Sequence, residues 1–350
     1  MSKSIRLAVD AMGGDLGPRV AIRAAYRLAK FQPNIQIRLY GQLDELAKYT
    51  PDSLDLSSLT ETTSDLIANG SEVIFCHACS VVTMGDKPAQ ALRHKQDSSM
   101  WLAVDSVRVG VADACVSAGN TGALMAMGRH LLKTFAGVDR PAISKLIPTA
   151  KSDCLMLDLG ASVKCDTEHL IHNALMGSVF MECVAGVDRP RVALLNIGSE
   201  DIKGNEQIRL AAAALQNNES VNYIGYIEGN QIYAGAADVV VCDGFVGNVA
   251  LKVSEGVAQL MAAQMKESFT QSWYGRLVGQ FARPLLRKWQ RHFDPDRYNG
   301  ASFLGLQGPL IKSHGGADEL AFYAALELAR DQVLNNVAGK TYEQFGRDHF

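Results

Sequence analysis

Short apolar runs alternate with longer amphipathic stretches along most of the chain. The apolar runs, several of them rich in Val, Ile or Leu, occupy residues 5–10, 35–40, 72–76, 112–117, 154–158, 191–196, 222–226 and 238–242. Runs of this length and composition predict buried β-strands. Helices are predicted between them, at residues 19–31, 121–135, 168–185 and 206–217. Strands that alternate with helices favour a three-layer α/β fold, in which a mostly parallel sheet carries helices on both faces.

The string Ala-Gly-Val-Asp-Arg-Pro occurs twice, at residues 136–141 and 185–190. The flanking sequences do not match, so we interpret the pair as two helix ends rather than as an internal duplication. Gly closes each helix, Pro forbids its continuation, and a strand should follow each time. No low-complexity linker divides the chain, so any domain boundary must be a place where the chain crosses between lobes, and we expect residues 1–350 to act as one unit of two lobes.

One segment departs from this alternation. Residues 268–293 contain no acidic residue, and Arg and Lys alternate there with Trp, Tyr, Phe, Leu and Val. This composition is typical of a basic amphipathic segment that lies at an interface. Pro284 is expected to kink the segment or to split it into two short helices.

Composition narrows the class of protein. The 350 residues correspond to about two domains. Apolar residues make up 47% and charged residues 20%, which excludes wholesale disorder and a collagen-like chain. The net charge of -3 gives no global sign of a nucleic-acid partner. Seven scattered cysteines indicate buried thiols in a reducing compartment. Without a signal-like or membrane-spanning apolar run, we expect a cytoplasmic protein that at most lies on a membrane.

Small and polar residues with glycine follow six of the predicted strands. In open α/β sheets, ligands bind at the carboxyl ends of the strands, so six such ends predict a shared polar cleft. The six segments are residues 11–15, 118–122, 159–162, 197–205, 227–229 and 243–248.

The residues at this cleft favour a phosphate ligand. Residues 119–122 open a predicted helix, whose free backbone N–H groups suit an anion. Gly13 and Gly14 permit close approach of the backbone. The run 87–99 adds cations and hydroxyls at helical spacing, and Lys203 adds a cation in a glycine-flanked loop. The run 87–99 could equally be a solvated helix face.

Several standard signatures are absent. The chain has no P-loop, no G-x-G-x-x-G after the first strand and no G-x-S-x-G elbow. Cys76 and Cys79 form a C-x-x-C without a second pair, and we interpret them as half-buried thiols. The histidines show no metal-ligand spacing with a third ligand, and His314 is more simply structural. We therefore predict neither a metal nor a cofactor.

Five motifs together resemble a known family. They are Asp10-Ala-Met-Gly-Gly-Asp15, the run from Lys87 to Met100, and residues 117–123, 194–205 and 242–248. They resemble the phosphate acyltransferases of bacterial phospholipid synthesis, from about residue 5 to residue 330. Two positions depart from the family pattern: Ser162 stands where the family usually has Asn, and His172-Asn173-Ala174 stands where it usually has Gln-Phe-Ala.

The resemblance implies a fold, a reaction and partners. The fold would be like that of isocitrate and isopropylmalate dehydrogenases and of phosphotransacetylase, with two intertwined α/β lobes, a cleft between them and a homodimer. The reaction would transfer an acyl group from acyl carrier protein to inorganic phosphate. The acyl phosphate would then feed the membrane-bound glycerol-3-phosphate acyltransferase.

We interpret the chemistry as direct attack of bound phosphate on the thioester, without an acyl-enzyme. Holding the two reactants together can itself contribute several kcal/mol. The candidate catalytic residues are Lys203, Asn248 and Asp243. The candidate phosphate and substrate ligands are Asp10, Gly13, Gly14, Asp15, Lys87, Arg93, Lys95, Ser98, Ser99, Ser117, Gly119, Asn120, Thr121, Gly122, Asn196 and Gly198. A covalent route through Cys or Ser is the rival, and it lacks an evident base beside a nucleophile.

The basic segment 268–293 has three interpretations. It could dock the acidic carrier protein, lie on anionic membrane, or pack within a dimer. The resemblance favours membrane contact near the dimer tip, through Trp273, Leu277, Phe281, Arg283 and Arg287. Two other functions stay open: a phosphotransacetylase that uses coenzyme A, and a membrane-associated scaffold of lipid synthesis.

Overall fold

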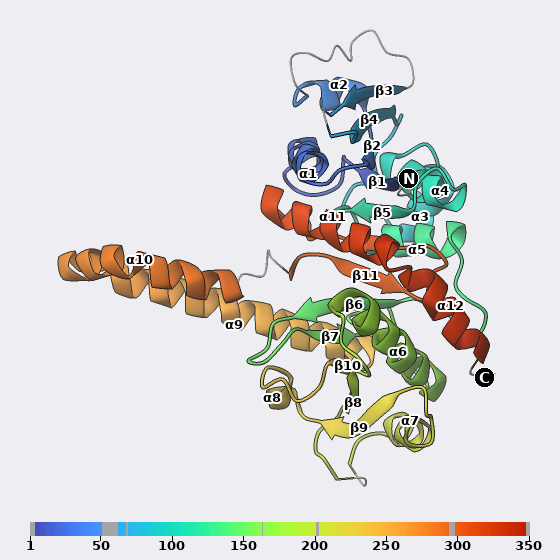
Figure 1. Cartoon of the computed structure of the whole chain (residues 1–350), viewed down its shortest axis with the longest axis vertical. Helices are drawn as coiled ribbons and strands as arrows, with labels where there is room; N and C mark the ends of the chain where they lie inside the picture. Colours follow the sequence, from blue (N-terminus) through green and yellow to red (C-terminus); the bar gives the residue numbers. More distant parts are fainter. Residues whose placement is uncertain are drawn as a thin grey trace.

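The computed structural model describes residues 4–50, 62–67, 69–162, 164–200, 203–293 and 298–347. Its centre is one twelve-stranded sheet in the order β3-β4-β2-β1-β5-β12-β11-β6-β7-β10-β8-β9. Helices cover both faces of this sheet, and a long helical hairpin projects from one side (Figure 1). The predicted three-layer α/β fold with a mostly parallel sheet is confirmed.

The first half of the sheet is parallel apart from its edge. Its strands are β1 (Ile5–Asp10), β2 (Ile35–Gly41), β4 (Glu72–His77), β5 (Ala114–Ser117) and β12 (Leu310–Lys312), with β3 (Thr62–Leu66) antiparallel at the edge. Side chains along β1 alternate between two cores, because successive residues of a strand point to opposite faces. Leu7 and Val9 join the core under one pair of helices, and Ala8 joins the core under another set.

Two groups of helices cover these two faces. The helices α1 (Pro18–Phe31) and α11 (Glu319–Leu334) contact each other over Leu7 and Val9. The opposite face carries α3 (Pro88–His94), α4 (Ser99–Arg108) and α5 (Thr121–Leu131), and α2 (Leu43–Ala47) follows β2. Helix α1 begins with Pro18 at a position where a missing N–H costs nothing, directly after Gly17 with its φ of 67°.

Antiparallel strands join the two halves of the sheet. β11 (Ala301–Leu304) is antiparallel to both β12 and β6 (Ala142–Ile147), and β6 is antiparallel to β7 (Cys154–Leu157). β6 and β8 are the strands that we expected after the two Ala-Gly-Val-Asp-Arg-Pro strings, and both expectations are confirmed. The structure adds β3, β11 and β12, which the apolar pattern did not predict.

The second half is again parallel, from β7 through β10 (Val239–Val241) and β8 (Arg191–Leu195) to β9 (Asn222–Ile227). One face packs against α6 (Thr167–Phe180), its π-helical continuation η1 (Met181–Ala185), α7 (Glu206–Gln216) and α12 (Val337–Arg347). The short α8 (Gly229–Ile232) and the start of α9 contribute to the core on the other face.

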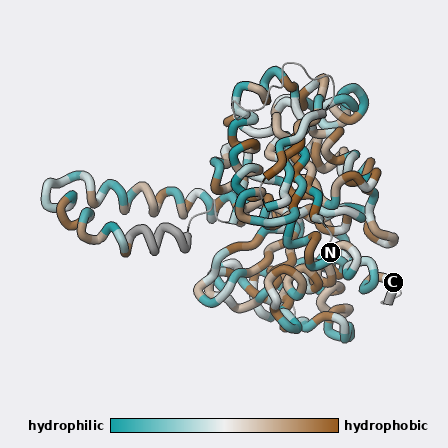
Figure 2. The backbone as a smooth tube through the Cα atoms, turned by 45° about the horizontal axis from the view of Figure 1, so that its top comes forward, coloured by the Kyte–Doolittle hydropathy of each residue, from teal (hydrophilic) through white to brown (hydrophobic). Residues whose placement is uncertain are grey.

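The projecting hairpin consists of α9 (Gly244–Thr270) and α10 (Trp273–Phe293) (Figure 1). Helix α10 is one continuous helix with Pro284 inside it. Of the two expected effects of Pro284, a split into two helices is therefore wrong, and a kink stays a prediction. Arg287 belongs to α10, but its side chain lies outside the described part of the structure. Apolar and polar residues alternate along the hairpin (Figure 2). None of the described helices combines the length and the apolar character that crossing a membrane requires.

Candidate functional site

A buried carboxylate organises the loops of the first half. Asp10 ends β1 and is only 2% exposed. It accepts hydrogen bonds from Ser99 Oγ at 2.6 Å and from Ser117 Oγ at 2.7 Å. Burial raises the pKa of the Asp10 carboxyl, while both hydroxyls and the charge of Lys312 oppose that rise. The structure thus brings together three predicted site residues that are distant in sequence.

The peptide between Ala118 and Gly119 is held at both of its edges. Gly119 N–H donates to Ser117 Oγ at 3.0 Å, and Lys312 Nζ donates to Ala118 O at 3.1 Å. Lys312 is 9% exposed, and burial lowers its pKa to about 8 against the opposing charges of Asp10 and Asp15. No sequence motif points to Lys312. It ends β12, a strand of three residues that the apolar pattern did not predict.

Asn120 shapes the start of α5 and does not present its amide to a ligand. Its Oδ1 accepts from Ala123 N–H at 3.0 Å, which makes it the N-cap of α5. Its Nδ2 donates to the carbonyls of Thr83, Met84 and Asp86. The structure therefore gives Ser117, Gly119 and Asn120 supporting contacts within the protein, and their direct contact with phosphate stays a prediction.

The first turn of α5 keeps donors for an anion. The N–H groups of Thr121 and Gly122 are too near the helix start to have intrahelical acceptors. Thr121 is exposed. A Cβ at Gly122 would lie 2.8 Å from Pro88 Cγ, so the start of α3 sits against the start of α5. Lys87, the residue directly before Pro88, is exposed and occupies the N-cap position of α3 without a side-chain capping bond.

The other residues of the run 87–99 have structural tasks or face solvent. Lys95 Nζ forms an ion pair with Asp86 at 2.6 Å and donates to Val81 O at 2.7 Å. Ser98 caps α4 and accepts from Trp101 N–H at 3.3 Å. Arg93 is exposed, as a solvated helix face would be.

Glycines allow the loop after β1 to approach its neighbours. A Cβ at Gly13 would lie 2.5 Å from Gly119 N, and one at Gly14, whose φ is 94°, would lie 3.0 Å from Gly315 O. Asp15 N–H donates to the same Gly315 carbonyl at 2.7 Å. The loops after β1, β5 and β12 therefore lie together, as expected for the carboxyl ends of neighbouring parallel strands.

A second buried carboxylate organises the loops of the other half. Asp158 follows β7 and accepts four peptide N–H groups, from Ile143, Gly160, Ala161 and Ser162, at 2.8–3.1 Å. Burial raises its pKa, and these four donors oppose the rise. Ser162 contacts Asp158 through its backbone, a contact that does not depend on the side chain at this position.

Asp243 and Asn248 lie at the start of α9, beside this loop. Asp243 is the N-cap of α9 and accepts from Val246 N–H at 2.9 Å. Asn248 Nδ2 donates to Leu159 O at 2.9 Å. An amide nitrogen carries two hydrogens, so Asn248 keeps a second one for another acceptor.

Asn196, Gly198 and Lys203 belong to one loop after β8. Asn196 Nδ2 donates to Lys203 O at 3.3 Å, and its buried Oδ1 has no hydrogen-bond partner in the described structure. A Cβ at Gly198 would lie 2.5 Å from Lys203 Cδ, so the Lys203 side chain passes directly over Gly198. Lys203 Nζ pairs with Glu200 at 2.9 Å, and both side chains are about half exposed.

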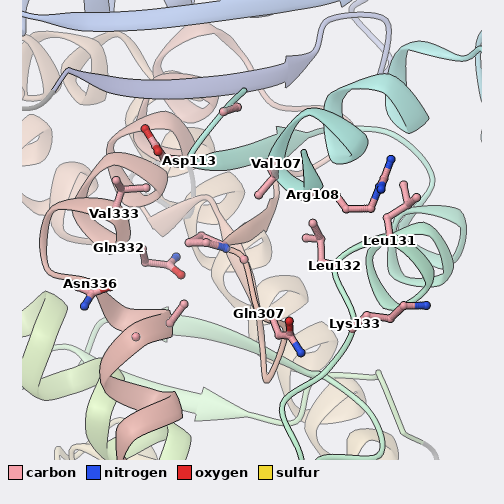
Figure 3. A pocket seen from close by; sticks show the side chains of 15 residues that line it. Val107, Arg108, Asp113, Leu131, Leu132, Lys133, Gln307, Gln332, Val333 and Asn336 are labelled. Carbon is pink, nitrogen blue, oxygen red and sulfur yellow. The ribbon is translucent and has the colours of Figure 1, made fainter. Parts of the chain in front are cut away.

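A sizeable cavity lies away from these loops. It has a volume of about 690 Å³ and is lined by residues of α4, α5, α11 and α12 (Figure 3). Asp113 and Pro309, two of its lining residues, precede β5 and β12, so the cavity is at the amino ends of these strands. Arg108 and Lys133 extend away from its centre (Figure 3). It is therefore distinct from the loops at the carboxyl ends.

The described residues contain neither a metal-binding cluster nor a pair of cysteines placed as a redox site. No group of three His, Cys, Asp or Glu side chains there could hold a metal ion. Cys76 is buried and Cys79 is exposed, with its Sγ 3.8 Å from His77 Nε2. His314 Nδ1 accepts from Gly316 N–H at 3.1 Å, which is a structural contact.

The fold defines the class of protein. The structure is similar to a phosphotransacetylase from Streptococcus pyogenes, with a TM-score of 0.62, 16% identity and coverage of 95% of each chain. It is also similar to the EutD phosphotransacetylase from Staphylococcus aureus, with a TM-score of 0.57, 14% identity and coverage of 94% of each chain. The phosphotransacetylase-like fold implied by the sequence motifs is therefore confirmed, and at such identities the likeness concerns the fold alone.

The sequence defines the family. Residues 5–340 match the family described as fatty acid synthesis protein. A phosphate acyltransferase from Pseudomonas fluorescens strain Pf0-1 is 49% identical over 334 residues, 95% of each chain. One from Legionella pneumophila strain Corby is 45% identical over 342 residues, 98% of this chain and 96% of the other. The chain belongs to this family of phosphate acyltransferases, and it is an acyltransferase of lipid synthesis.

Proposed function

We propose that the protein transfers a fatty acyl group from acyl carrier protein to inorganic phosphate and releases acyl phosphate. The observation that carries this proposal is the start of α5. There, the N–H groups of Thr121 and Gly122 can donate to one anion. The Thr121 hydroxyl and Lys87, which directly precedes the Pro88 that contacts this turn, are the proposed further donor and positive charge. Membership in the phosphate acyltransferases supports phosphate as that anion.

The proposed chemical step is direct attack. A phosphate oxygen forms a bond to the thioester carbon, the carbonyl oxygen becomes an oxyanion, and the C–S bond then breaks to release the carrier thiolate. Phosphate is partly dianionic near neutral pH, so the step needs no strong general base. The second hydrogen of Asn248 Nδ2 is the proposed oxyanion donor, and Lys203 is a counter-charge. Asp243 contributes by capping the helix that carries Asn248.

The two parallel halves of the sheet are the proposed lobes of a single catalytic unit, with the substrates between their loops. We propose a homodimer as its working form. The exposed face of α9 supports this, because Phe245, Val249, Val253, Val257 and Leu260 follow one another at helical spacing and are 48–62% exposed. A second copy of the chain would remove this apolar stripe from water.

The tip of the hairpin is the proposed membrane contact. Trp273, Leu277 and Phe281 are spaced four residues apart on α10 and are 50–80% exposed. Arg283 is also exposed and is positioned to meet anionic headgroups. This would bring a lipophilic product to the membrane-bound glycerol-3-phosphate acyltransferase. Replacing the three apolar residues by Ser should abolish sedimentation with anionic vesicles but spare activity in solution; undiminished vesicle binding would exclude this contact.

The fold likeness favours one second candidate, a phosphotransacetylase that uses coenzyme A. The test is to incubate the full chain with palmitoyl–acyl carrier protein or palmitoyl–coenzyme A, each with and without inorganic phosphate. Free carrier protein and hydroxylamine-trappable acyl phosphate should appear only with phosphate and faster from the carrier-protein donor. Turnover of only the coenzyme A donor would establish the second candidate. If neither donor is turned over, the protein would instead be a scaffold of lipid synthesis that has the fold of the enzymes without their activity.

A further inference from the structure

Lys312 is a buried cation to which neither the sequence motifs nor the proposed chemistry assigns a role. It ends β12 opposite Ser117 of β5 and opposite Ala301 of β11. Its ammonium group donates to the carbonyls of Ala118 and Ser313. Burying a charged ammonium group costs free energy unless it is paired or hydrogen-bonded. A buried lysine at this position therefore suggests that its contacts have a function.

The contacts of Lys312 define that task. A peptide plane has one oxygen and one N–H on opposite sides, and here both are held. Lys312 holds the Ala118 oxygen, while Ser117 Oγ accepts the Gly119 N–H. Ser117 in turn donates to Asp10, and Asp10 accepts from Ser99 at the start of α4. The orientation of the chain that enters α5 therefore depends on Lys312 as much as on Asp10.

We propose that Lys312 is a positioning residue, whose charged ammonium group fixes the Ala118–Gly119 peptide so that the first turn of α5 faces the phosphate. It does not touch the phosphate itself. Its charge also adds to the positive potential at the helix start, which the buried surroundings screen weakly. This inference rests on the proposed phosphate site and adds the residue that sets its geometry.

Charges around Lys312 make its effect dependent on pH. Asp10 at the end of β1 and Asp15 in the following loop act on the ammonium group, and burial outweighs both and lowers its pKa to about 8. The thiol of Cys115 on β5 stays un-ionised because burial raises its pKa well above the usual value. β11 contains no titratable residue. Loss of the Lys312 proton above pH 8 should therefore weaken the hold on phosphate.

The variants for the test are Lys312→Met, which removes donor and charge, and Lys312→Arg, which keeps both. Lys312→Gln keeps a donor without the charge, and it replaces the Met variant if that one does not fold. Lys145→Met is the matched control, because Lys145 lies on β6, its side chain is 16% exposed and it pairs with Glu255 in the other half. Circular dichroism and thermal unfolding establish that each variant is folded.

Two measurements are made on each full-length variant between pH 6.5 and pH 9.5. Calorimetric titration with inorganic phosphate gives Kd without an acyl donor, and steady-state kinetics gives KM for phosphate and for palmitoyl–acyl carrier protein. The Met and Gln variants should raise Kd and KM for phosphate about tenfold and leave KM for the acyl donor within about twofold. The Arg variant should recover most of the affinity, and Lys145→Met should behave as wild type. The ratio of wild-type to variant affinity cancels the ionisation of phosphate and should fall above pH 8.

The outcomes separate the two proposals. Unchanged phosphate affinity in both uncharged variants, or a ratio independent of pH, overturns the role of Lys312. Equal losses in both KM values together with a lower Tm indicate a purely structural residue and overturn it as well. Phosphate binding that depends on Lys312 in a protein that does not use acyl carrier protein overturns only the proposed donor. A wild type that neither binds phosphate nor turns over overturns both.

Discussion

Two buried aspartates at the ends of sheet strands organise the two halves of the molecule by different means. Asp10 is held mainly by side chains: the hydroxyls of Ser99 and Ser117 donate to it, the charge of Lys312 is nearby, and the Met12 backbone adds one peptide donor. Asp158 is held by backbone: four peptide N–H groups, three of them from the loop that directly follows it. The hydroxyl bonds to Asp10 join segments up to 107 residues apart, whereas the bonds to Asp158 are mostly local.

The partners of Asp10 and those of Asp158 differ in whether they can change with pH or with a bound ligand. Hydroxyls can rotate to another acceptor and an ammonium group can lose its proton, so the partners of Asp10 can rearrange or change charge. Peptide N–H groups do neither, so the loop around Asp158 can only keep or lose its bonds. We therefore expect the Asp10 half to respond to pH and phosphate, and the Asp158 half to act as a rigid support for Asn248.

The largest effect should come from removing the two carboxylates. Asp158→Ala strands buried N–H groups that cost about 1 kcal/mol or more each, so we expect a loss of about 4 kcal/mol in the free energy of unfolding. Asp10→Ala should cost about 2 kcal/mol, because the two hydroxyls find other acceptors and Lys312 can release its proton. Urea unfolding of both variants tests this. An equal or larger loss for Asp10→Ala would contradict the contrast.

A glycine pair on α9 tests the rigidity of the second half. A Cβ at Gly247 would lie 1.9 Å from the Asp158 carbonyl oxygen, whereas one at Gly256 would meet nothing within 4 Å. Gly247→Ala should destabilise the protein by about 3 kcal/mol, because the backbone of a tightly bonded loop must move. Gly256→Ala should stabilise it by up to about 1 kcal/mol through helix propensity. Thermal unfolding measures both changes. If Gly247→Ala leaves stability unchanged, the loop around Asp158 can move to accommodate the added methyl group and is not rigid.

The pH dependence of stability tests the first half. Burial lowers the pKa of Lys312 from 10.5 in the unfolded chain to about 8 in the folded protein. Between these values the unfolded state binds more protons, so the free energy of unfolding rises with pH. The contribution should be about 2 kcal/mol between pH 7.5 and pH 9.5. Urea unfolding should show it in wild type and in Lys145→Met. If the free energy of unfolding of Lys312→Met rises with pH as steeply as that of wild type, another group causes the pH dependence.

These contrasts also show how far sequence reasoning reaches. The short apolar runs predicted β1, β5, β7 and β8, because strands buried on both faces are continuously apolar. The glycine and polar residues after them located the loops. Lys312 was missed because its strand has three residues and its acceptor Ala118 is 194 residues away. Sequence also could not show that the polar atoms of Ser117 and Asn120 bond to neighbouring loops, contacts that only the fold brings about.

The smallest expected effect is the difference between removing two cations of one helix. Lys87 directly precedes Pro88, the residue of α3 that lies against Gly122, whereas Arg93 lies in the last turn of α3. Both cations are exposed. Lys87→Ala should raise KM for phosphate about tenfold, because a charge-assisted contact contributes about 1.4 kcal/mol. Arg93→Ala should change KM less than about twofold, and neither variant should shift Tm. Steady-state kinetics at fixed ionic strength tests this, because salt screens both charges alike. Equal effects of the two variants would mean that phosphate senses only the general potential of this surface, and the contact at the start of α5 would then have to come from backbone donors alone.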